Sequence, residues 1–198
     1  MSIADQIIRA KNDYDEVYAS GKKAEYDRFW DAYQDYGNRV QYPYAFYNWG
    51  DEEFKPKYPI IFGSNVSAQD TFSYCGMTEV PVDIIVQEGY NIHSAFYYCT
   101  QLREIKKIVI TENSTIDNHC FDGCWSLNNI RFEGKIGNSI NFQWSPLVKA
   151  SVENIFSVLS ANASGKKLTL SSGSKGEFTA DEWNALVATR TNWTISIV

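Results

Sequence analysis

The stretch FYYCTQLREI at residues 96–105 recurs as FDGCWSLNNI at 121–130, and a shorter version, FSYCGMTEV, stands at 72–80. The phenylalanines that open the three phrases are 24 and 25 residues apart. Self-similarity at a period of roughly 20 to 50 residues is the signature of a stacked repeat array. The recurring slots hold phenylalanine, cysteine, methionine or leucine, and valine or isoleucine: Phe72, Cys75, Met77 and Val80; Phe96, Cys99, Leu102 and Ile105; Phe121, Cys124, Leu127 and Ile130.

One such phrase cannot fold alone. Each large apolar side chain contributes about 1.5 to 3 kcal/mol when it is fully buried, whereas fixing the backbone costs about 1 to 2 kcal/mol for each of roughly two dozen residues. Only neighbouring units that share a core can offset this cost. We therefore predict an α+β solenoid of about three to four turns, whose recurring side chains line the interior and whose exterior serves recognition.

Composition narrows the function classes. The chain has 198 residues, 44% of them apolar, so it can form a hydrophobic core. Its length fits one domain, or one domain with an appendage. A net charge of -6 and a pI near 5.0 argue against nucleic acid or an anionic membrane as the main partner. Aromatic residues make up 15% of the chain. They either fill the turns and helix interfaces or form exposed contacts with a protein or ligand, and both explanations stay open.

Residues 1–37 are predicted to form a helical segment. Apolar side chains recur there at steps of three and four, and a second, aromatic stripe ends at Gly37, a good left-handed helix terminus. The stripe has two roles open to it, capping the first turn of the solenoid or pairing with another subunit. The second role predicts a homo-oligomer, with these oligomerisation or docking residues: Ile3, Ile7, Tyr14, Val17, Phe29 and Trp30.

Three further segments follow. Residues 38–64 form an aromatic and proline-rich connector, because its prolines and glycines disfavour a long helix or a central strand. Residues 65–150 form the repeat array, in which each unit gives a short strand, such as 107–110 or 129–132, followed by an irregular return. A degenerate fourth turn covers 140–147.

Residues 151–198 are predicted to be an α/β cap. Ser151 precedes an apolar helical face and is expected to cap that helix. Residues 167–171 resemble a strand, and Thr179 with Glu182 forms a capping box at the start of another helix. Residues 193–197 alternate like a final strand. A departure from the repeat is what the end of such an array requires.

The cysteines invite a metal interpretation, which their spacing argues against. Structural zinc sites group their ligands as two close pairs. Here three cysteines recur at the repeat period, in one slot where a small apolar side chain fits between stacked turns: Cys75, Cys99 and Cys124. Cys120 stands in the slot that holds Thr71 and Ala95 in the other units, so it also reads as a small filler. We expect no metal and no cofactor.

His93 and His119 are the two histidines of the chain and lie about one repeat apart. A hydrolase would need one of them beside a nucleophile and an orienting carboxylate. The sequence contains no nucleophile elbow, phosphate-binding glycine loop or dinucleotide fingerprint. We expect both histidines at the surface, assign no catalytic residue, and keep a hydrolase only as the alternative from another class.

The repeated phrase, with the intervening segment 108–121, resembles the BspA-type leucine-rich repeats of bacterial surface proteins over about residues 65–135. The C-terminal part looks like the closing segment of such arrays. The helical N-terminal part is similar to the leading segment of short repeat proteins from gut bacteria and their prophages. The resemblance implies a short leucine-rich-repeat array, adhesion or recognition of a host surface, and no catalytic residues.

The predicted function is therefore a non-enzymatic recognition or adhesion module. Its repeat surface is expected to bind a protein or glycan on a cell surface, or other virion proteins, with no nucleic acid and no membrane insertion. The favoured context is a phage tail or virion component, and the alternative is a BspA-type adhesin of the bacterial cell surface. The sequence shows no secretory signal, which fits a virion component released by lysis, and a cytoplasmic location stays open.

Binding residues are expected among the exposed aromatics. One group lies in the connector and the other in the repeats: Tyr42, Tyr44, Tyr47 and Trp49, then Tyr97, Tyr98 and Trp125. Tyr97 and Tyr98 both precede Cys99, so at most one of the two rings is expected to face inward. Tyrosine and tryptophan present large, rigid contact areas and are favoured at interfaces.

Overall fold

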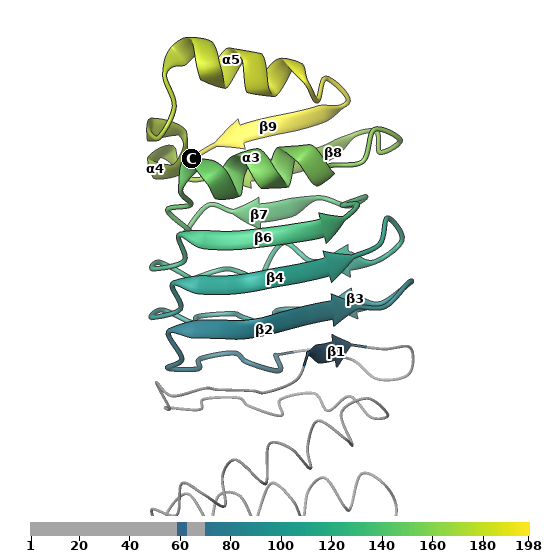
Figure 1. Cartoon of the computed structure of the whole chain (residues 1–198), viewed down its shortest axis with the longest axis vertical. Coiled ribbons are helices and arrows are strands. Elements are labelled where there is room, and N and C mark those ends of the chain that lie inside the picture. The colour runs from purple at the N-terminus through teal and green to yellow at the C-terminus, as the bar shows by residue number, and fades with distance from the viewer. Residues whose placement is uncertain (1–58, 63–69) are drawn as a thin grey trace, which may run out of the picture.

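The computed structural model describes residues 59–62 and 70–198 (Figure 1). The predicted helical segment 1–37, with its docking residues, lies outside the described residues. So does most of the connector 38–64, including its four candidate binding aromatics. In the described part, successive repeats lie one above another, and each adds one long strand to the same wall of the molecule.

This front wall is a four-stranded parallel sheet. Its strands follow one another in chain order: β1 (Ile60–Phe62), β2 (Glu79–Val86), β4 (Glu104–Ile110) and β6 (Asn129–Gly134). The register aligns the last slot of the phrases, with Val80 opposite Ile105 and Ile105 opposite Ile130. All three side chains are buried. The strands predicted at 107–110 and 129–132 are confirmed within β4 and β6.

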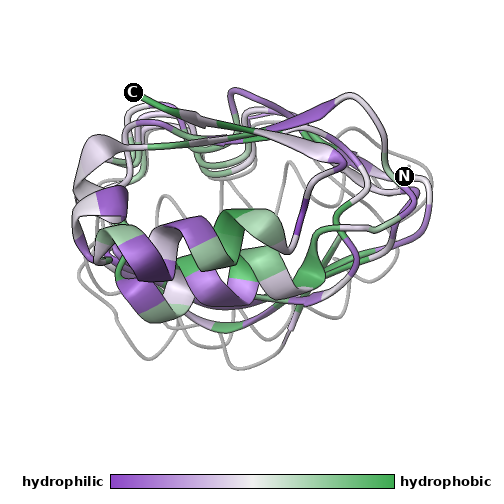
Figure 2. Ribbon diagram, turned by 90° about the horizontal axis from the view of Figure 1, so that it is seen from above, coloured by the Kyte–Doolittle hydropathy of each residue, from purple (hydrophilic) through white to green (hydrophobic). Residues whose placement is uncertain are grey.

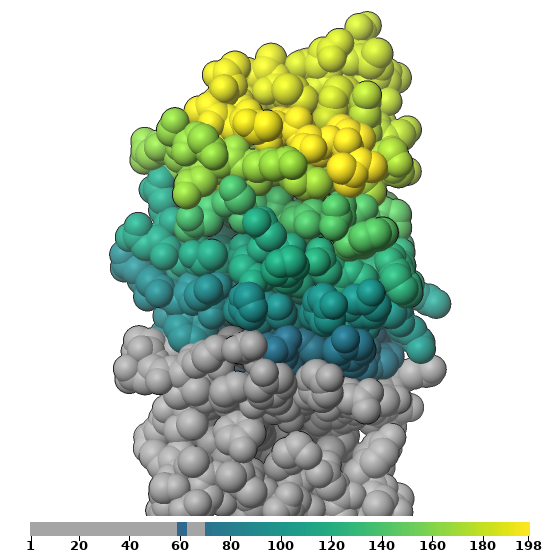
Figure 3. Space-filling model, turned by 180° about the vertical axis from the view of Figure 1, so that it is seen from behind, coloured from purple at the N-terminus to yellow at the C-terminus, as the bar shows by residue number. Residues whose placement is uncertain are grey.

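Shorter strands form the back wall. β3 (Asn91–Ile92) pairs in parallel with β5 (Thr115–Ile116). Above them, β7 (Ile140–Phe142), β8 (Lys166–Leu170) and β9 (Trp193–Ile197) form a three-stranded parallel sheet. Seen from above, the chain runs around a flattened outline, and the C-terminal helices lie over one long side of it (Figure 2). From behind, the layers succeed one another in chain order up to the C-terminus (Figure 3).

A column of phenylalanine rings fills the interior. Phe72 and Phe96 stack with centroids 5.3 Å apart and an interplanar angle of 11°, and Phe96 and Phe121 stack at 5.9 Å and 5°. Phe142 of the fourth unit continues the column, 4.8 Å from Phe121. None of the four is more than 1% exposed. The prediction that the recurring phenylalanines share one buried environment is confirmed, and each ring pair adds about 0.5 to 1.5 kcal/mol beyond simple burial.

Helix α3 (Lys149–Val158) lies beside β6, where the next front strand would otherwise be (Figure 1). The side-chain amide of Asn154 pairs with both backbone groups of Phe132: its oxygen accepts the N–H at 2.6 Å and its nitrogen donates to the C=O at 3.1 Å. The hydroxyl of Ser151 accepts the N–H of Ile130 at 3.0 Å. The helix thereby satisfies the backbone groups at the edge of the sheet, which are costly to leave unpaired.

The prediction that Ser151 caps this helix is wrong. The N-cap is Val148, which makes no side-chain capping hydrogen bond, and Ser151 lies buried inside the helix. A serine before an apolar helical face is compatible with either position. Its hydroxyl instead accepts a hydrogen bond from the N–H of Ile130 at the sheet edge, a contact between distant residues that the local sequence pattern does not predict.

The C-terminal elements follow the prediction more closely. Helix α5 (Ala180–Ala188) opens with the expected capping box between Thr179 and Glu182. Its Trp183 is buried against Phe156 and Phe178, with ring centroids 6.1 and 5.7 Å away. The strands predicted at 167–171 and 193–197 are confirmed as β8 and β9, the first displaced by one residue. The short helix α4 (Ser172–Gly176) was not predicted.

Sheet hydrogen bonding crosses two predicted boundaries. Strand β1 lies inside the segment assigned to the connector 38–64, yet it pairs with β2 of the array. Strand β7 of the array pairs with β8 of the predicted cap 151–198. Parallel strands pair with the strands that are adjacent in space. The predicted segment boundaries were placed where the composition changes along the chain, and these positions do not coincide with the edges of a sheet.

Candidate functional site

The candidate site comprises the back strands β3, β5 and β7 with the turns that follow them, and the corresponding turn of the first unit. We define the turn face as residues 70–76, 91–100, 115–126 and 140–147. In each unit the buried phenylalanine is followed, two residues later, by a position facing outward or at the turn. That slot holds Tyr74, Tyr98, Gly123 and Trp144 in the successive units. The three aromatic side chains at this slot are 42%, 37% and 49% exposed.

Four rings on the turn face form an aromatic cluster, which we define as Tyr74, Tyr97, Tyr98 and Trp125. Tyr74 stacks on Tyr98, with centroids 5.5 Å apart and an interplanar angle of 24°. Tyr97 packs edge-on to Tyr74 at 5.6 Å and tilted against Tyr98 at 4.7 Å. Trp125 meets Tyr98 at 5.7 Å and is 53% exposed. The cluster is therefore organised by ring contacts between successive units while much of its surface remains in water.

Gly123 explains why the column of outward rings is interrupted in the third unit. Its backbone is left-handed, with φ of 75°, and a Cβ added there would lie 3.0 Å from two atoms of the Tyr98 ring. Only glycine therefore lets the Tyr98 ring lie directly against the backbone of the next unit. The exposed aromatic residue of that unit is Trp125, two residues further on, and its ring meets that of Tyr98 edge-on.

Tyr74 and Tyr98 occupy the same left-handed conformation as Gly123, with φ of 61° and 56°. This conformation costs a non-glycine residue about 1 to 2 kcal/mol. Glycine, as in the third unit, would avoid that cost. The two tyrosines are thus placed where the backbone favours glycine and where their rings stay partly exposed, a combination typical of contact surfaces.

Aspartates beside the cluster hold the turns together. Asp117 accepts the backbone N–H groups of Ser94 and His119, each at 3.1 Å. Asp122 accepts a hydrogen bond from the amide of Asn141 at 3.4 Å, which joins the third unit to the fourth. The backbone of Asp122 also contacts the cluster, because its carbonyl accepts the backbone N–H of Tyr98 at 2.7 Å. The polar and aromatic parts of the turn face are therefore adjacent.

Both histidines lie at the surface, as predicted, and each contacts an aspartate. The imidazole of His93 pairs with Asp117, and Nδ1 of His119 lies 2.8 Å from Asp122. The hydrogen bond with Asp122 raises the pKa of His119 above its usual value. Across the described residues, no hydrogen bond joins either imidazole to a serine, threonine or cysteine. The third member that a hydrolytic triad requires is therefore not beside either pair in this part of the chain.

The cysteines occupy the interior, as predicted. All four are buried free thiols: Cys75, Cys99, Cys120 and Cys124. The thiol of Cys99 donates to the carbonyl of Phe72 at 2.9 Å, and that of Cys124 to the carbonyl of Phe96 at 3.1 Å. Burial raises the pKa of Cys124 to about 12. Thiols held in this way act as small apolar fillers with a weak donor, and within the described residues no group of side chains is arranged to hold a metal ion.

Three of the candidate binding residues are brought together: Tyr97, Tyr98 and Trp125 all belong to the aromatic cluster. Neither Tyr97 nor Tyr98 is buried, in agreement with the expectation that at most one faces inward. Sequence reasoning missed Tyr74 and Trp144. Their common position, two residues after the buried phenylalanine, was the signal that could have found them.

The chain was compared with protein-family models, curated proteins and solved structures. No protein-family model matches the chain, and no match was found among curated proteins or solved structures. Within residues 59–62 and 70–198, no helix combines the length and the apolar character needed to cross a membrane.

Proposed function

We propose that this chain is a non-enzymatic recognition module whose turn face binds a protein or a glycan. The observation that carries the proposal is the aromatic cluster: four rings from successive units, packed on one another, with Trp125 more than half exposed at 53%. Exposed tyrosine and tryptophan on a rigid support are the side chains that dominate binding at interfaces. The stacked units supply that support, since each is fixed by its neighbours.

We further propose that the units form a short leucine-rich-repeat solenoid of the BspA type. Support comes from one front strand per unit, the aligned closing slots of the phrases, and the continuous phenylalanine column. Edge pairing by α3 and the helical cap above it fit the end of such an array, where the last rung has to be covered.

The proposed biological context is a phage tail or virion component that contacts a host surface, and the alternative is an adhesin of the bacterial cell surface. An antibody against this chain distinguishes the two contexts when it is used to probe purified phage particles and fractionated cell envelopes. Detection in particles supports the first context, and detection in envelopes of cells free of phage supports the second.

The recognition function itself is tested by replacing the two most exposed rings of the turn face. Labelled wild-type protein and a Trp125→Ala/Trp144→Ala variant are applied to a panel of gut bacteria and to arrayed bacterial glycans. Loss of such aromatic anchors is expected to weaken binding about tenfold or more. Val198→Ala, an exposed apolar position at the C-terminus, is the matched control. Unchanged binding by a correctly folded double variant would refute the assignment of the turn face.

A further inference from the structure

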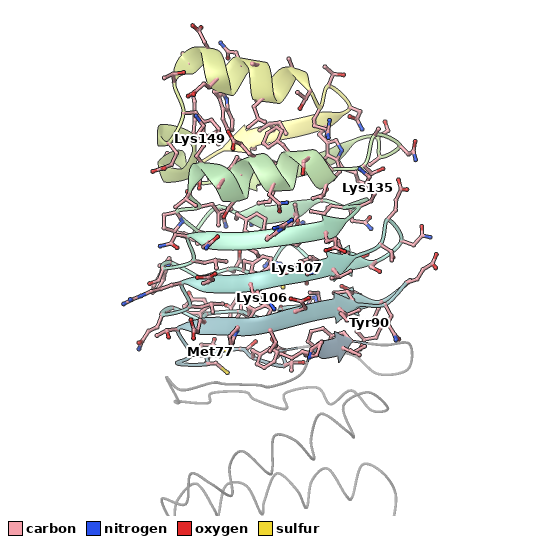
Figure 4. All side chains as sticks on the ribbon, viewed as in Figure 1. Met77, Tyr90, Lys106, Lys107, Lys135 and Lys149 are labelled. Atoms are coloured by element: carbon pink, nitrogen blue, oxygen red, sulfur yellow. The ribbon has the colours of Figure 1, made fainter. Side chains whose placement is uncertain are left out.

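Charge is distributed unevenly over the described surface. The turn face carries three aspartates, two histidines and no lysine or arginine. Lysines lie elsewhere: Lys106 and Lys107 on the front sheet, Lys135 at the far end of β6 and Lys149 at the start of α3 (Figure 4). On the front sheet the charges are largely paired within the chain, since Lys107 contacts both Asp83 and Glu133. The turn face therefore presents negative charge without a compensating lysine or arginine.

The carboxylates of the turn face are held by groups of the same face, and two of them also contact a histidine: Asp117 pairs with His93 and Asp122 with His119. Asp117 accepts two backbone N–H groups. Asp70 accepts the hydroxyl of Ser73 at 3.0 Å, and Asp122 accepts the amide of Asn141. These bonds hold the carboxylates in fixed positions on the turn face, so their electrostatic field is organised before any partner arrives.

Aromatic faces add to this field, because the face of a tyrosine or tryptophan ring carries negative electrostatic potential and attracts cations. Trp125 and Trp144 are 53% and 49% exposed, so part of each indole is open to a partner. The hydroxyl groups of a neutral sugar can donate hydrogen bonds to carboxylates, but only a cationic side chain gains from both the charge of the aspartates and the potential of the ring faces.

Resting on the proposed recognition function, we propose that the turn face binds a cationic protein segment, with arginine or lysine side chains placed against Trp125 and the cluster beside Asp122. The charge of the partner complements both features of the surface. Arginine is expected to bind better than lysine because its planar group stacks on an aromatic ring and forms paired hydrogen bonds with a carboxylate.

The test is a calorimetric titration of the full chain with a short peptide in which arginine alternates with glycine. Matched peptides replace arginine by lysine, glutamine or glutamate. The arginine peptide is expected to bind, more tightly than the lysine peptide, and to lose affinity as salt is raised. Equal binding of the glutamine peptide, or preference for the glutamate peptide, overturns the proposal.

Variants locate the binding. Trp125→Leu keeps an apolar side chain but removes the aromatic face, and it is expected to lower the affinity for the arginine peptide about fivefold. Asp122→Asn keeps the shape and removes the charge, and is expected to weaken it about threefold. Glu177→Gln, which removes an exposed carboxylate outside the turn face, is the control and leaves affinity unchanged. If Trp125→Leu does not fold by circular dichroism, Trp144→Leu takes its place. Wild-type affinity in the folded tryptophan variant overturns the proposal.

The same variants separate this inference from the function on which it rests. If no cationic peptide binds, yet Trp125→Leu abolishes attachment to cells or arrayed glycans, the cationic partner is refuted and the recognition function stands. If wild-type protein binds neither the peptides nor the cells nor the glycans, both are refuted.

Discussion

The pairing of Asn154 with the edge of the front sheet makes a quantitative prediction. Its amide serves both the N–H and the C=O of Phe132, a residue that is 1% exposed. Asn154→Ala removes both partners and leaves two backbone groups without a protein hydrogen bond at a partly buried edge. An unsatisfied buried group costs about 1 to 3 kcal/mol. Because water can reach part of this edge, we expect a total loss of about 2 to 3 kcal/mol.

Urea and thermal unfolding, followed by circular dichroism and tryptophan fluorescence, measure this loss. For a chain of this size it corresponds to a decrease in Tm of roughly 4 to 12 °C. The denaturant m-value should stay constant, because the native surface is unchanged. Glu153→Ala, the exposed neighbour on the same helix, is the control and should shift stability by no more than about 0.5 kcal/mol.

A second substitution at this position tests the geometry rather than the volume. Asn154→Asp keeps an acceptor for the Phe132 N–H but places a carboxylate oxygen against the Phe132 carbonyl. The new carboxyl group can donate to that carbonyl only when it is protonated. This variant should therefore regain stability relative to the wild type as the pH is lowered. If Asn154→Ala were no less stable than Glu153→Ala, the idea that α3 closes the sheet edge through this amide would be refuted.

Three further predictions concern other parts of the fold. Gly123→Ala should cost about 1 to 3 kcal/mol by chemical denaturation, since φ there is 75° and the new Cβ would meet the Tyr98 ring; an unchanged midpoint would contradict the close approach. The four thiols should resist alkylating reagents near neutral pH until the chain unfolds, because burial raises the pKa of Cys124 to about 12; rapid labelling of the native protein would show that the interior opens. Hydrogen bonds from Lys149 and Thr179 lower the pKa of Glu182 to about 2. The ionised carboxylate therefore contributes its full stabilisation above the ordinary pKa of glutamate, and this stabilisation is lost as the pH falls towards 2. An ordinary pKa for Glu182 in a carboxyl titration by NMR would contradict this prediction.

The interior could be predicted from the sequence because the same few side chains recur at a fixed period. When successive units stack, identical slots meet, so Phe96 finds Phe72 and Phe121 without any long-range information. The capping box formed by Thr179 and Glu182 could also be predicted, because it depends on two residues only three positions apart. Stacking also explains why the fourth phenylalanine, Phe142, joins the column although its spacing of 21 residues differs from the repeat.

Contacts between a side chain and the backbone of another unit could not be predicted. Ser151 has the local pattern of an N-cap, yet it serves the N–H of Ile130, and Asn154 pairs with Phe132 across 22 residues. On the turn face, sequence reasoning selected Tyr98 and Trp125 as exposed aromatics but did not include Tyr74. Which rings meet depends on how adjacent turns are offset, and in the third unit that offset brings the Tyr98 ring against the backbone of Gly123.

The sequence by itself determined the period, the side chains that line the interior, and the capping box of the last helix, because each depends on spacing along one stretch of chain. The tertiary structure alone decided that a helix closes the front sheet and that rings from separate turns gather beside aspartates on one face. Those outcomes depend on distances between units, and such distances arise only when the backbone turns are stacked in their final register.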